Sequence, residues 1–356
     1  MTPSMATFGN QQPRRQVKRG DVDSRTNNGY STSAQAGNPE GKQSRKLWKK
    51  LLVTLLILAA IVGIGLGALW FYIKATPLKG EGAGRINIMV LGVDDAASLS
   101  DTIMIASIDT SGDDPTLVAL ISIPRDLYVQ IPEFGGSKIN AAYTYGQSSD
   151  YPEGGPGLSR ATLEGTFDLP IHYYAALDFT GFRELIDTVG GVDIDVKTEI
   201  EDPFYPNDDY SDTQTFYLPT GRQHMDGETA LRYARSRITT TDFDRAARQQ
   251  QILGAFRQRV VSRNILLSGQ KRRALQQTLE QHLKTDLSIR QMLKLGWLLR
   301  NLEDAQISRH VIDNTNFLES DGGGAYVPRT GDFDQINQFI ADIFEQTGNN
   351  LPETQQ

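Results

Sequence analysis

The sequence predicts an α/β protein, in which a single transmembrane helix precedes a layered α-β-α domain with a central mixed β-sheet. Two observations lead to this prediction. One long uncharged apolar run lies near the N-terminus, and short runs rich in Ile, Val, Met and Leu alternate with helical stretches after it. Alternating strands and helices are typical of layered α/β domains. With 356 residues the chain has room for a tail, an anchor and such a domain.

The apolar run predicts a membrane anchor. Residues Leu51 to Ile73 carry no charge, and as a helix they would span about 35 Å, enough to cross a bilayer. Arg45, Lys46, Lys49 and Lys50 lie before the run, so the positive-inside rule predicts a cytoplasmic N-terminus and an extracytoplasmic C-terminal domain in the cell membrane. A cleaved signal peptide is the alternative, but the run is long and no Ala-x-Ala site follows.

Composition divides the chain further. The first fifty residues are rich in Gln, Asn, Ser, Gly and Arg and are expected to be disordered. They hold ten of the 36 basic residues but only three of the 43 acidic ones, so the rest of the chain is acidic and unsuited to nucleic-acid binding. The expected divisions are a basic tail (1–50), an anchor (51–73), a spacer (74–84), a folded domain (85–348) and a flexible C-terminus (349–356).

Within the domain, apolar runs predict strands and helical periods predict helices. The expected strands are 85–93, 102–109, 116–123, 127–131, 172–178, 192–196 and 309–312. The expected helices are 138–145, 157–167, 179–189, 227–234, 243–263, 271–283, 289–302 and 333–344. The segment Glu199–Tyr217, rich in Asp, Pro and Tyr, is expected to be a loop; its Asp spacing does not match a calcium loop.

Four arginines crowd the start of one expected helix, between Arg235 and Gln250. Asp242 is the expected N-cap, which places Arg245 and Arg248 in the first two turns, where the helix dipole disfavours cations. Exposed amide groups and several guanidiniums at one point favour a multiply charged anion. The alternative is a solvated basic face.

Two carboxylates follow the first expected strand. Asp94 ends Leu91-Gly-Val-Asp, and Asp101 begins the next strand, so the two would meet at one rim of the sheet if these strands are neighbours. Two carboxylates with few other protein ligands suit Mg²⁺ that shares phosphate oxygens, with Mn²⁺ as an alternative. They could equally be turn and cap residues. Arg125 follows a later strand at the same rim, and Lys138 opens an expected helix.

The sequence lacks the residue patterns of several other kinds of active site. The chain has no Cys, its four His residues show no ligand spacing, and no Gly-x-Ser-x-Gly sequence occurs. The glycines Gly80, Gly82 and Gly84 precede a strand, whereas phosphate-binding loops follow one.

Seven segments together resemble the LytR–CpsA–Psr family. In order along the chain they are IMVLGVDD, SDTIMIASID, SIPRDLYVQIP, KINAAY, GGVDIDV, ALRYARSR and DFDRAARQQ, and the resemblance covers residues 87–261.

The resemblance implies a membrane-anchored phosphotransferase. It would move a glycopolymer from an undecaprenyl-pyrophosphate carrier to a peptidoglycan hydroxyl. Asp94 and Asp101 would hold Mg²⁺, and Asp242 would orient an arginine or accept the hydroxyl proton. The residues expected to contact phosphate oxygens are Arg125, Lys138, Arg235, Arg237 and Arg245, with Gln249 beside them. An apolar channel between sheet and helices would receive the lipid.

One position departs from the family pattern. The family carries an arginine before Ser-Asp-Thr, and this chain has Leu99 there. Arg248 is a candidate replacement. The departure also keeps open a non-catalytic polyprenyl-phosphate-binding scaffold or regulator of envelope assembly. Transcriptional control through the basic tail is disfavoured, because the tail has no helix-turn-helix pattern.

Overall fold

A computed structural model describes residues 40–96, 99–112, 117–206, 212–236, 242–260, 268–303 and 306–348. The expected tail up to residue 39 and the C-terminus from residue 349 lie outside these ranges. The chain divides after Gly65 into two units, and the second unit holds the last turns of the first helix together with the folded domain.

The first helix, α1 (Glu40–Lys74), contains the predicted anchor. Its segment Leu52–Tyr72 is long and apolar enough to cross a membrane, and it is not buried against other parts of the protein. This agrees with a single membrane-spanning helix. The helix begins at Glu40, however, eleven residues before the predicted start.

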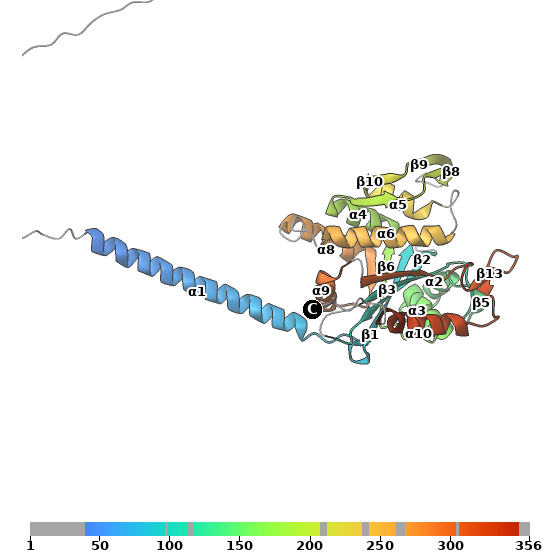
Figure 1. The fold of residues 1–356 in the computed structure, drawn as a ribbon, viewed down its shortest axis with the longest axis horizontal. Coiled ribbons are helices and arrows are strands. Elements are labelled where there is room, and N and C mark those ends of the chain that lie inside the picture. The colour runs from blue at the N-terminus through green and yellow to red at the C-terminus, as the bar shows by residue number, and fades with distance from the viewer. Residues whose placement is uncertain are drawn as a thin grey trace, which may run out of the picture. The chain divides into compact units, whose positions relative to one another are not determined.

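The folded domain is built on a mixed six-stranded sheet, as predicted (Figure 1). The strand order is β11-β6-β1-β2-β3-β12, with parallel β1–β6 and β3–β12 pairs and antiparallel neighbours elsewhere. The strands are β1 (Arg85–Val93), β2 (Ser100–Asp109), β3 (Val118–Ile123), β6 (Tyr173–Asp178), β11 (Leu283–Thr285) and β12 (Ile307–Val311).

Alternate residues of the central strands pack into two different cores. On β1, Met89 and Leu91 belong to one buried cluster, while Ile86 and Ile88 belong to another. This two-residue period makes both faces of the sheet apolar, so each face needs a helical layer. One layer consists of α2 (Ala141–Gln147), α3 (Gly154–Phe167) and α10 (Asp334–Gly348), and the other includes α4 (Phe179–Val189), α6 (Asp242–Val260) and α9 (Ile289–Leu298).

A third core lies beyond α4 and α6. It joins these helices to α5 (Gly227–Arg235) and to two antiparallel strand pairs. One pair is β7 (Val192–Val196) with β10 (Gly221–Met225), and the other is the hairpin of β8 (Ile200–Pro206) with β9 (Thr213–Leu218), which lies between them along the chain. The remaining elements are β4 (Tyr128–Ile131), β5 (Gly135–Lys138), α8 (Gly269–His282), β13 (Leu318–Ser320), β14 (Tyr326–Pro328) and the 3₁₀ turns Glu81–Ala83 and Leu299–Asn301.

Two expectations about local structure are wrong. The segment Glu199–Tyr217, expected to be a loop, contains the β8–β9 hairpin. A register shift between Asp202 and Tyr205 interrupts the alternation of buried residues, which hides the strand from a periodicity test. Lys138 does not open a helix. It ends β5, opposite Tyr128, and α2 begins three residues later.

Candidate active site

The ends of β1 and β2 form one rim of the sheet. The strands are antiparallel neighbours, so Asp94 and Asp101 lie at the same rim, as predicted. Gly92 pairs with Thr102 and Val93 pairs with Ser100, which leaves Asp101 as an extra residue in a β-bulge. Such bulges redirect a side chain away from the regular pleat. Here the bulged residue is one of the two expected metal ligands.

Arg125 reaches the same rim from the end of β3. Its Nη1 donates to Oδ1 of Asp101 at 2.5 Å, and its Nε lies 3.5 Å from Oδ2 of Asp126. The other oxygen of Asp126 lies 2.9 Å from Nζ of Lys138. The antiparallel pairing of β4 with β5 therefore brings Lys138 to Arg125 through a shared carboxylate. Three of the expected site residues, Asp101, Arg125 and Lys138, therefore belong to one network of ion pairs.

A cavity of about 500 Å³ opens between the sheet and the helices α4, α5 and α6. Its walls are mainly apolar, and include Met104, Phe182, Leu185, Ile186, Ile252 and Phe256. Polar side chains enter the lining from the expected site, namely Asp101, Arg235, Arg245 and Gln249. The sequence could not locate this cavity, because its walls come from segments that are distant along the chain.

Arg235 is held by aromatic rings. It lies in the last turn of α5, where the helix dipole favours a cation. Its guanidinium carbon lies 4.4 Å from the centre of the Phe179 ring, and its Nη1 lies 3.4 Å from the Tyr205 hydroxyl. Stacking on a ring fixes the plane of the guanidinium while its edge stays available for hydrogen bonds.

The start of α6 brings a second arginine to the cavity. The helix begins at Asp242, one residue before the expected start, because Asp242 was expected to be the N-cap. Arg245 in its first turn lines the cavity although only 6% of its surface is exposed. Gln249 lies one turn later and donates to the carbonyl of Ala234 at 3.3 Å. Arg237 lies outside the described residues, as does the side chain of Asp242. Their predicted roles stay predictions.

Arg248 occupies a different environment from Arg245. Its Nε donates to the carbonyl of Tyr233 at 2.8 Å, and its Nη2 donates to the carbonyl of Ser236. It is buried and is not part of the cavity lining. These bonds join α6 to the C-terminal end of α5 and so position Arg235. Leu99, whose missing arginine Arg248 was expected to replace, is 39% exposed just before β2, and that replacement stays a prediction.

Three acidic or phenolic residues near the site were not anticipated. Asp178 lines the cavity at the end of β6, where it caps α4 and bonds His282 at 2.9 Å. Asp202 also lines the cavity and accepts a bond from Ser236. Tyr143 is fully buried, and its hydroxyl has no hydrogen-bond partner among the residues that the structure describes. Burial is the main cause that raises the pKa of Tyr143, and the charge of Asp94 raises it further. A strand-ending Asp before a helix could have signalled Asp178; the others depend on tertiary contacts.

The donor set at the rim fits a magnesium ion. Asp94 and Asp101 supply only oxygen atoms. Among the described residues, no group of three or more His, Cys, Asp or Glu side chains gathers as a closed metal cage. Mg²⁺ often takes one or two carboxylates and completes its shell with water and phosphate oxygens. Two carboxylates beside an arginine-lined cavity match that preference.

The chain belongs to the LytR_cpsA_psr family, whose pattern matches residues 72–340. It is 34% identical over 245 residues to TagU of Oceanobacillus iheyensis, covering 67% of this chain and 68% of TagU. It is 28% identical over 315 residues to TagV of Bacillus subtilis, covering 78% of this chain and 76% of TagV. Both relatives are named polyisoprenyl-teichoic acid–peptidoglycan teichoic acid transferases. The crystal structure of B. subtilis TagV matches the fold with a TM-score of 0.57 and 26% identity, over 72% of this chain and 96% of that chain.

Proposed function

We propose that this protein is a phosphotransferase that moves a glycopolymer from an undecaprenyl-pyrophosphate carrier to peptidoglycan. The cavity is the observation that carries the proposal. Its apolar walls suit a polyprenyl chain, and Arg235 and Arg245 in its lining suit the pyrophosphate. The names of TagU and TagV support the same donor and acceptor classes.

The reaction requires attack by a peptidoglycan hydroxyl on the phosphorus that carries the glycan. A phosphodiester bond forms, the pyrophosphate P–O–P bond breaks, and undecaprenyl phosphate leaves. The acceptor proton passes to a base, for which Asp242 at the start of α6 is the candidate. Phosphoryl transfer depends mainly on positioning and on neutralised oxygen charge, which explains a site made largely of cations.

The arginines divide this task. Arg235 and Arg245 would grip the pyrophosphate from the cavity side, with Gln249 beside them. Arg125, linked to Lys138 through Asp126, would approach from the rim of the sheet. Arg237, which precedes α6 in the sequence, would act with them. Planar guanidiniums stay charged and bind two oxygens at once, so they suit this role better than lysines.

Asp94 and Asp101 would hold Mg²⁺ at the rim. The ion would neutralise pyrophosphate oxygens and thereby make the phosphorus easier to attack. Arg125, which pairs with Asp101, would keep that carboxylate in place.

We further propose that the folded domain lies on the outer face of the membrane. Four cations precede the membrane segment within residues 45–50, which favours a cytoplasmic N-terminus. Peptidoglycan is assembled outside the membrane, so the acceptor would meet the site there.

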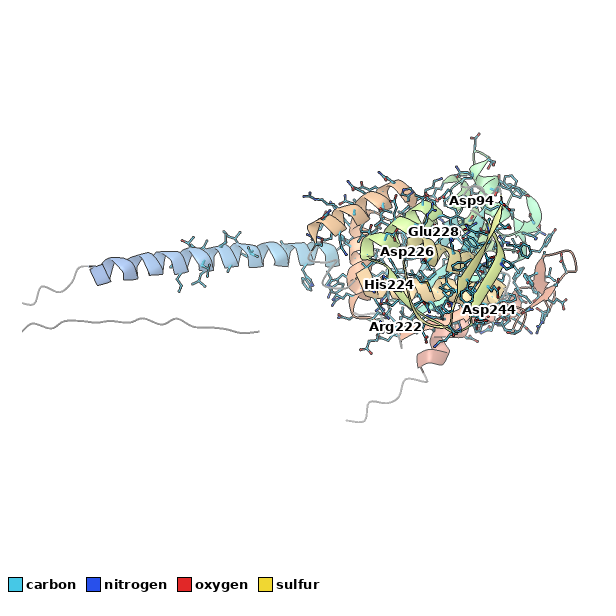
Figure 2. The ribbon with its side chains drawn as sticks, turned by 90° about the horizontal axis from the view of Figure 1, so that it is seen from above. Asp94, Arg222, His224, Asp226, Glu228 and Asp244 are labelled. Carbon is cyan, nitrogen blue, oxygen red and sulfur yellow. The ribbon has the colours of Figure 1, made fainter. Side chains whose placement is uncertain are left out.

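A reconstitution experiment tests the function. The full-length chain in detergent is incubated with a polyprenyl-pyrophosphate-linked glycan, a peptidoglycan fragment and Mg²⁺. The expected products are polyprenyl phosphate and glycan-linked peptidoglycan, lost in Arg245→Ala. Arg222→Ala is the control, since Arg222 is largely exposed on β10 and lies far from Asp94 in Figure 2.

A non-catalytic scaffold or regulator that binds polyprenyl phosphates is the second candidate. The observation in its favour is Leu99, which places an uncharged side chain where the family carries an arginine. The same experiment separates the two. Donor binding without any product would reject the transferase and support the scaffold.

A further inference from the structure

Helix α9 has two apolar faces, and only one of them is buried in the protein. Leu295 and Leu298 are buried in the core against the sheet. Ile289 and Leu293, one turn apart, are 64% and 52% exposed, and Gly296 continues the same exposed face. An ordinary surface helix would carry polar residues at these positions. This exposed apolar face is therefore a candidate contact surface.

The same helix is tied to the segment that follows α1. Nζ of Lys294, which is only 5% exposed, lies 2.6 and 2.7 Å from the two carboxylate oxygens of Glu81 and donates to the carbonyl of Thr76 at 2.8 Å. One turn earlier, Nε2 of Gln291 lies 3.4 Å from the carbonyl oxygen of Pro77. The segment after the membrane helix is thus bound to α9 at several points.

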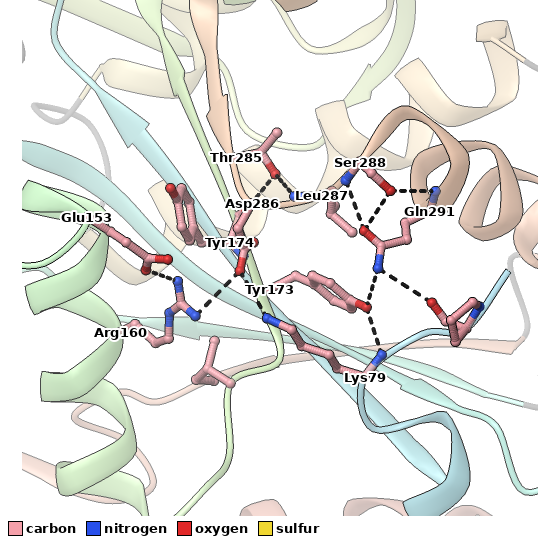
Figure 3. A network of polar contacts seen from close by, with 12 residues as sticks. Lys79, Glu153, Arg160, Tyr173, Tyr174, Thr285, Asp286, Leu287, Ser288 and Gln291 are labelled. Carbon is pink, nitrogen blue, oxygen red and sulfur yellow. Dashed lines mark hydrogen bonds and ion pairs between the residues drawn. The ribbon is translucent and has the colours of Figure 1, made fainter.

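Figure 3 shows how this attachment continues to the sheet. Gln291 also donates to the hydroxyl of Tyr173 on β6 at 3.0 Å, and that hydroxyl accepts the backbone N–H of Lys79 at 2.7 Å. Asp286, just before α9, contacts both Lys79 and Arg160 of α3. These bonds make the attachment part of the folded domain and not a flexible tether.

The attachment limits how far α9 can lie from a bilayer. The candidate membrane span ends at Tyr72, five residues before Pro77. Five residues reach at most about 17 Å when fully extended. Within this distance Arg290 of α9 already contacts Tyr72, with its guanidinium carbon 4.4 Å from the ring centre. The start of α9 therefore lies close to the end of the candidate membrane span.

The residues around that face suit an anionic bilayer surface. α9 contains no acidic residue, and Arg290 and Arg300 are exposed near its two ends. Trp297 stacks under Arg300, with 4.0 Å between the guanidinium carbon and the ring centre. Aromatic rings, cations and aliphatic side chains on one helix are typical of interfacial membrane contacts.

We propose that the exposed face of α9, formed by Ile289, Leu293 and Gly296 with Arg290 and Arg300, inserts into the headgroup region of the membrane that α1 anchors. The partner is an anionic lipid surface. The contact holds the domain in one orientation, so the active site has a defined height above the bilayer. This inference depends on the membrane anchor and not on the transfer reaction.

Single-cysteine labelling of the full-length chain in vesicles tests the proposal. The chain has no cysteine, so Leu293→Cys gives one labelling site for a nitroxide. The vesicles contain phosphatidylcholine and phosphatidylglycerol, and collisions with oxygen and with a water-soluble nickel chelate are measured. We expect a several-fold higher oxygen-to-nickel ratio at position 293 than for Tyr217→Cys, which lies on β9 and is 57% exposed.

Each outcome has a defined meaning. Equal ratios at 293 and 217 would place the face in water and overturn the proposal. A label immobilised and shielded from both reagents would indicate a protein partner and would also overturn it. Ile289→Cys gives a second site on the same face, and thermal unfolding of each variant verifies that it is folded. A raised ratio at both sites supports the proposal even if the protein lacks transferase activity.

Discussion

Arg235 combines features that a lysine could not reproduce. Its guanidinium stacks on Phe179 and lies near the Tyr205 hydroxyl, so both its plane and its position are set before a ligand arrives. A lysine in its place would keep the charge but lose the stacking and the paired donors.

Arg235→Lys is therefore expected to lower turnover by roughly ten- to hundredfold, because a charged hydrogen bond is worth about 1.5–3 kcal/mol. The measurement is the rate of glycan transfer at saturating donor. Arg222→Lys, on the exposed β10, should change the rate little. Equal rates for Arg235→Lys and the unaltered protein would show that the paired guanidinium donors of Arg235 are not needed to bind the pyrophosphate.

Substitution of Asp101 tests whether the rim of the sheet binds magnesium. Asp101→Asn keeps the size of the side chain and removes its charge, so activity and its stimulation by Mg²⁺ should be lost together. Transfer is measured across a series of Mg²⁺ concentrations, with thermal unfolding as a check because Arg125 loses its ion pair. Glu201→Gln, an exposed position on β8, is the control. Normal activity with normal Mg²⁺ dependence in Asp101→Asn would reject the metal site.

At the scale of elements, α3 contains two glycines that differ in whether a side chain would fit: there is no room for one at Gly157, and there is open space at Gly165. A methyl group at Gly157 would lie 1.9 Å from the carbonyl oxygen of Pro152, whereas a methyl group at Gly165 would meet nothing within 4 Å. Gly157 is needed for the tight start of the helix, and Gly165 only weakens it.

Gly157→Ala is expected to lower the free energy of unfolding by at least about 2 kcal/mol, because backbone must move. Gly165→Ala should raise it by about 0.5–1 kcal/mol, since alanine favours the helix. Urea unfolding followed by circular dichroism measures both. If the two variants were equally stable, the close approach of Pro152 to α3 would be wrong.

Long elements were predicted well and short ones poorly. The bounds of β1 and α4 match the predictions, because a strong local period identifies each. The strands β5, β13 and β14 were missed, since three or four residues carry no usable period and depend on their partners for pairing. The error at Lys138 has the same origin, since the expected helix 138–145 began at the last residue of the missed strand β5.

At the scale of the whole molecule, His310 links the sheet to α10 and makes stability depend on pH. It lies on β12 with its ring centre 5.3 Å from that of Phe339, and within the described part of the chain its Nε2 has no hydrogen-bond partner. Burial lowers its pKa below the ordinary value of 6.5. The folded protein therefore binds this proton less readily than the unfolded chain does.

Since the folded pKa is depressed, the stability contribution of His310 is present above pH 6.5 and is lost as the pH falls through the folded pKa. His310→Phe should lose less stability than the unaltered protein between neutral and mildly acidic pH. Urea unfolding at a series of pH values measures this. Identical pH dependence in both proteins would contradict the role of His310.

The sequence by itself determined the membrane helix, the α/β class and the family, and it predicted which charged residues form the site. These features are encoded locally, in an uncharged apolar run, in strand and helix periods, and in short motifs. Only the tertiary structure decided what those charges do. Arg245 lines the cavity while Arg248, three residues later, bonds to carbonyls at the end of α5, because almost one further turn along the helix places its side chain beside different tertiary neighbours. The cavity and the attachment of α9 likewise arise from contacts between distant segments, which no local pattern records.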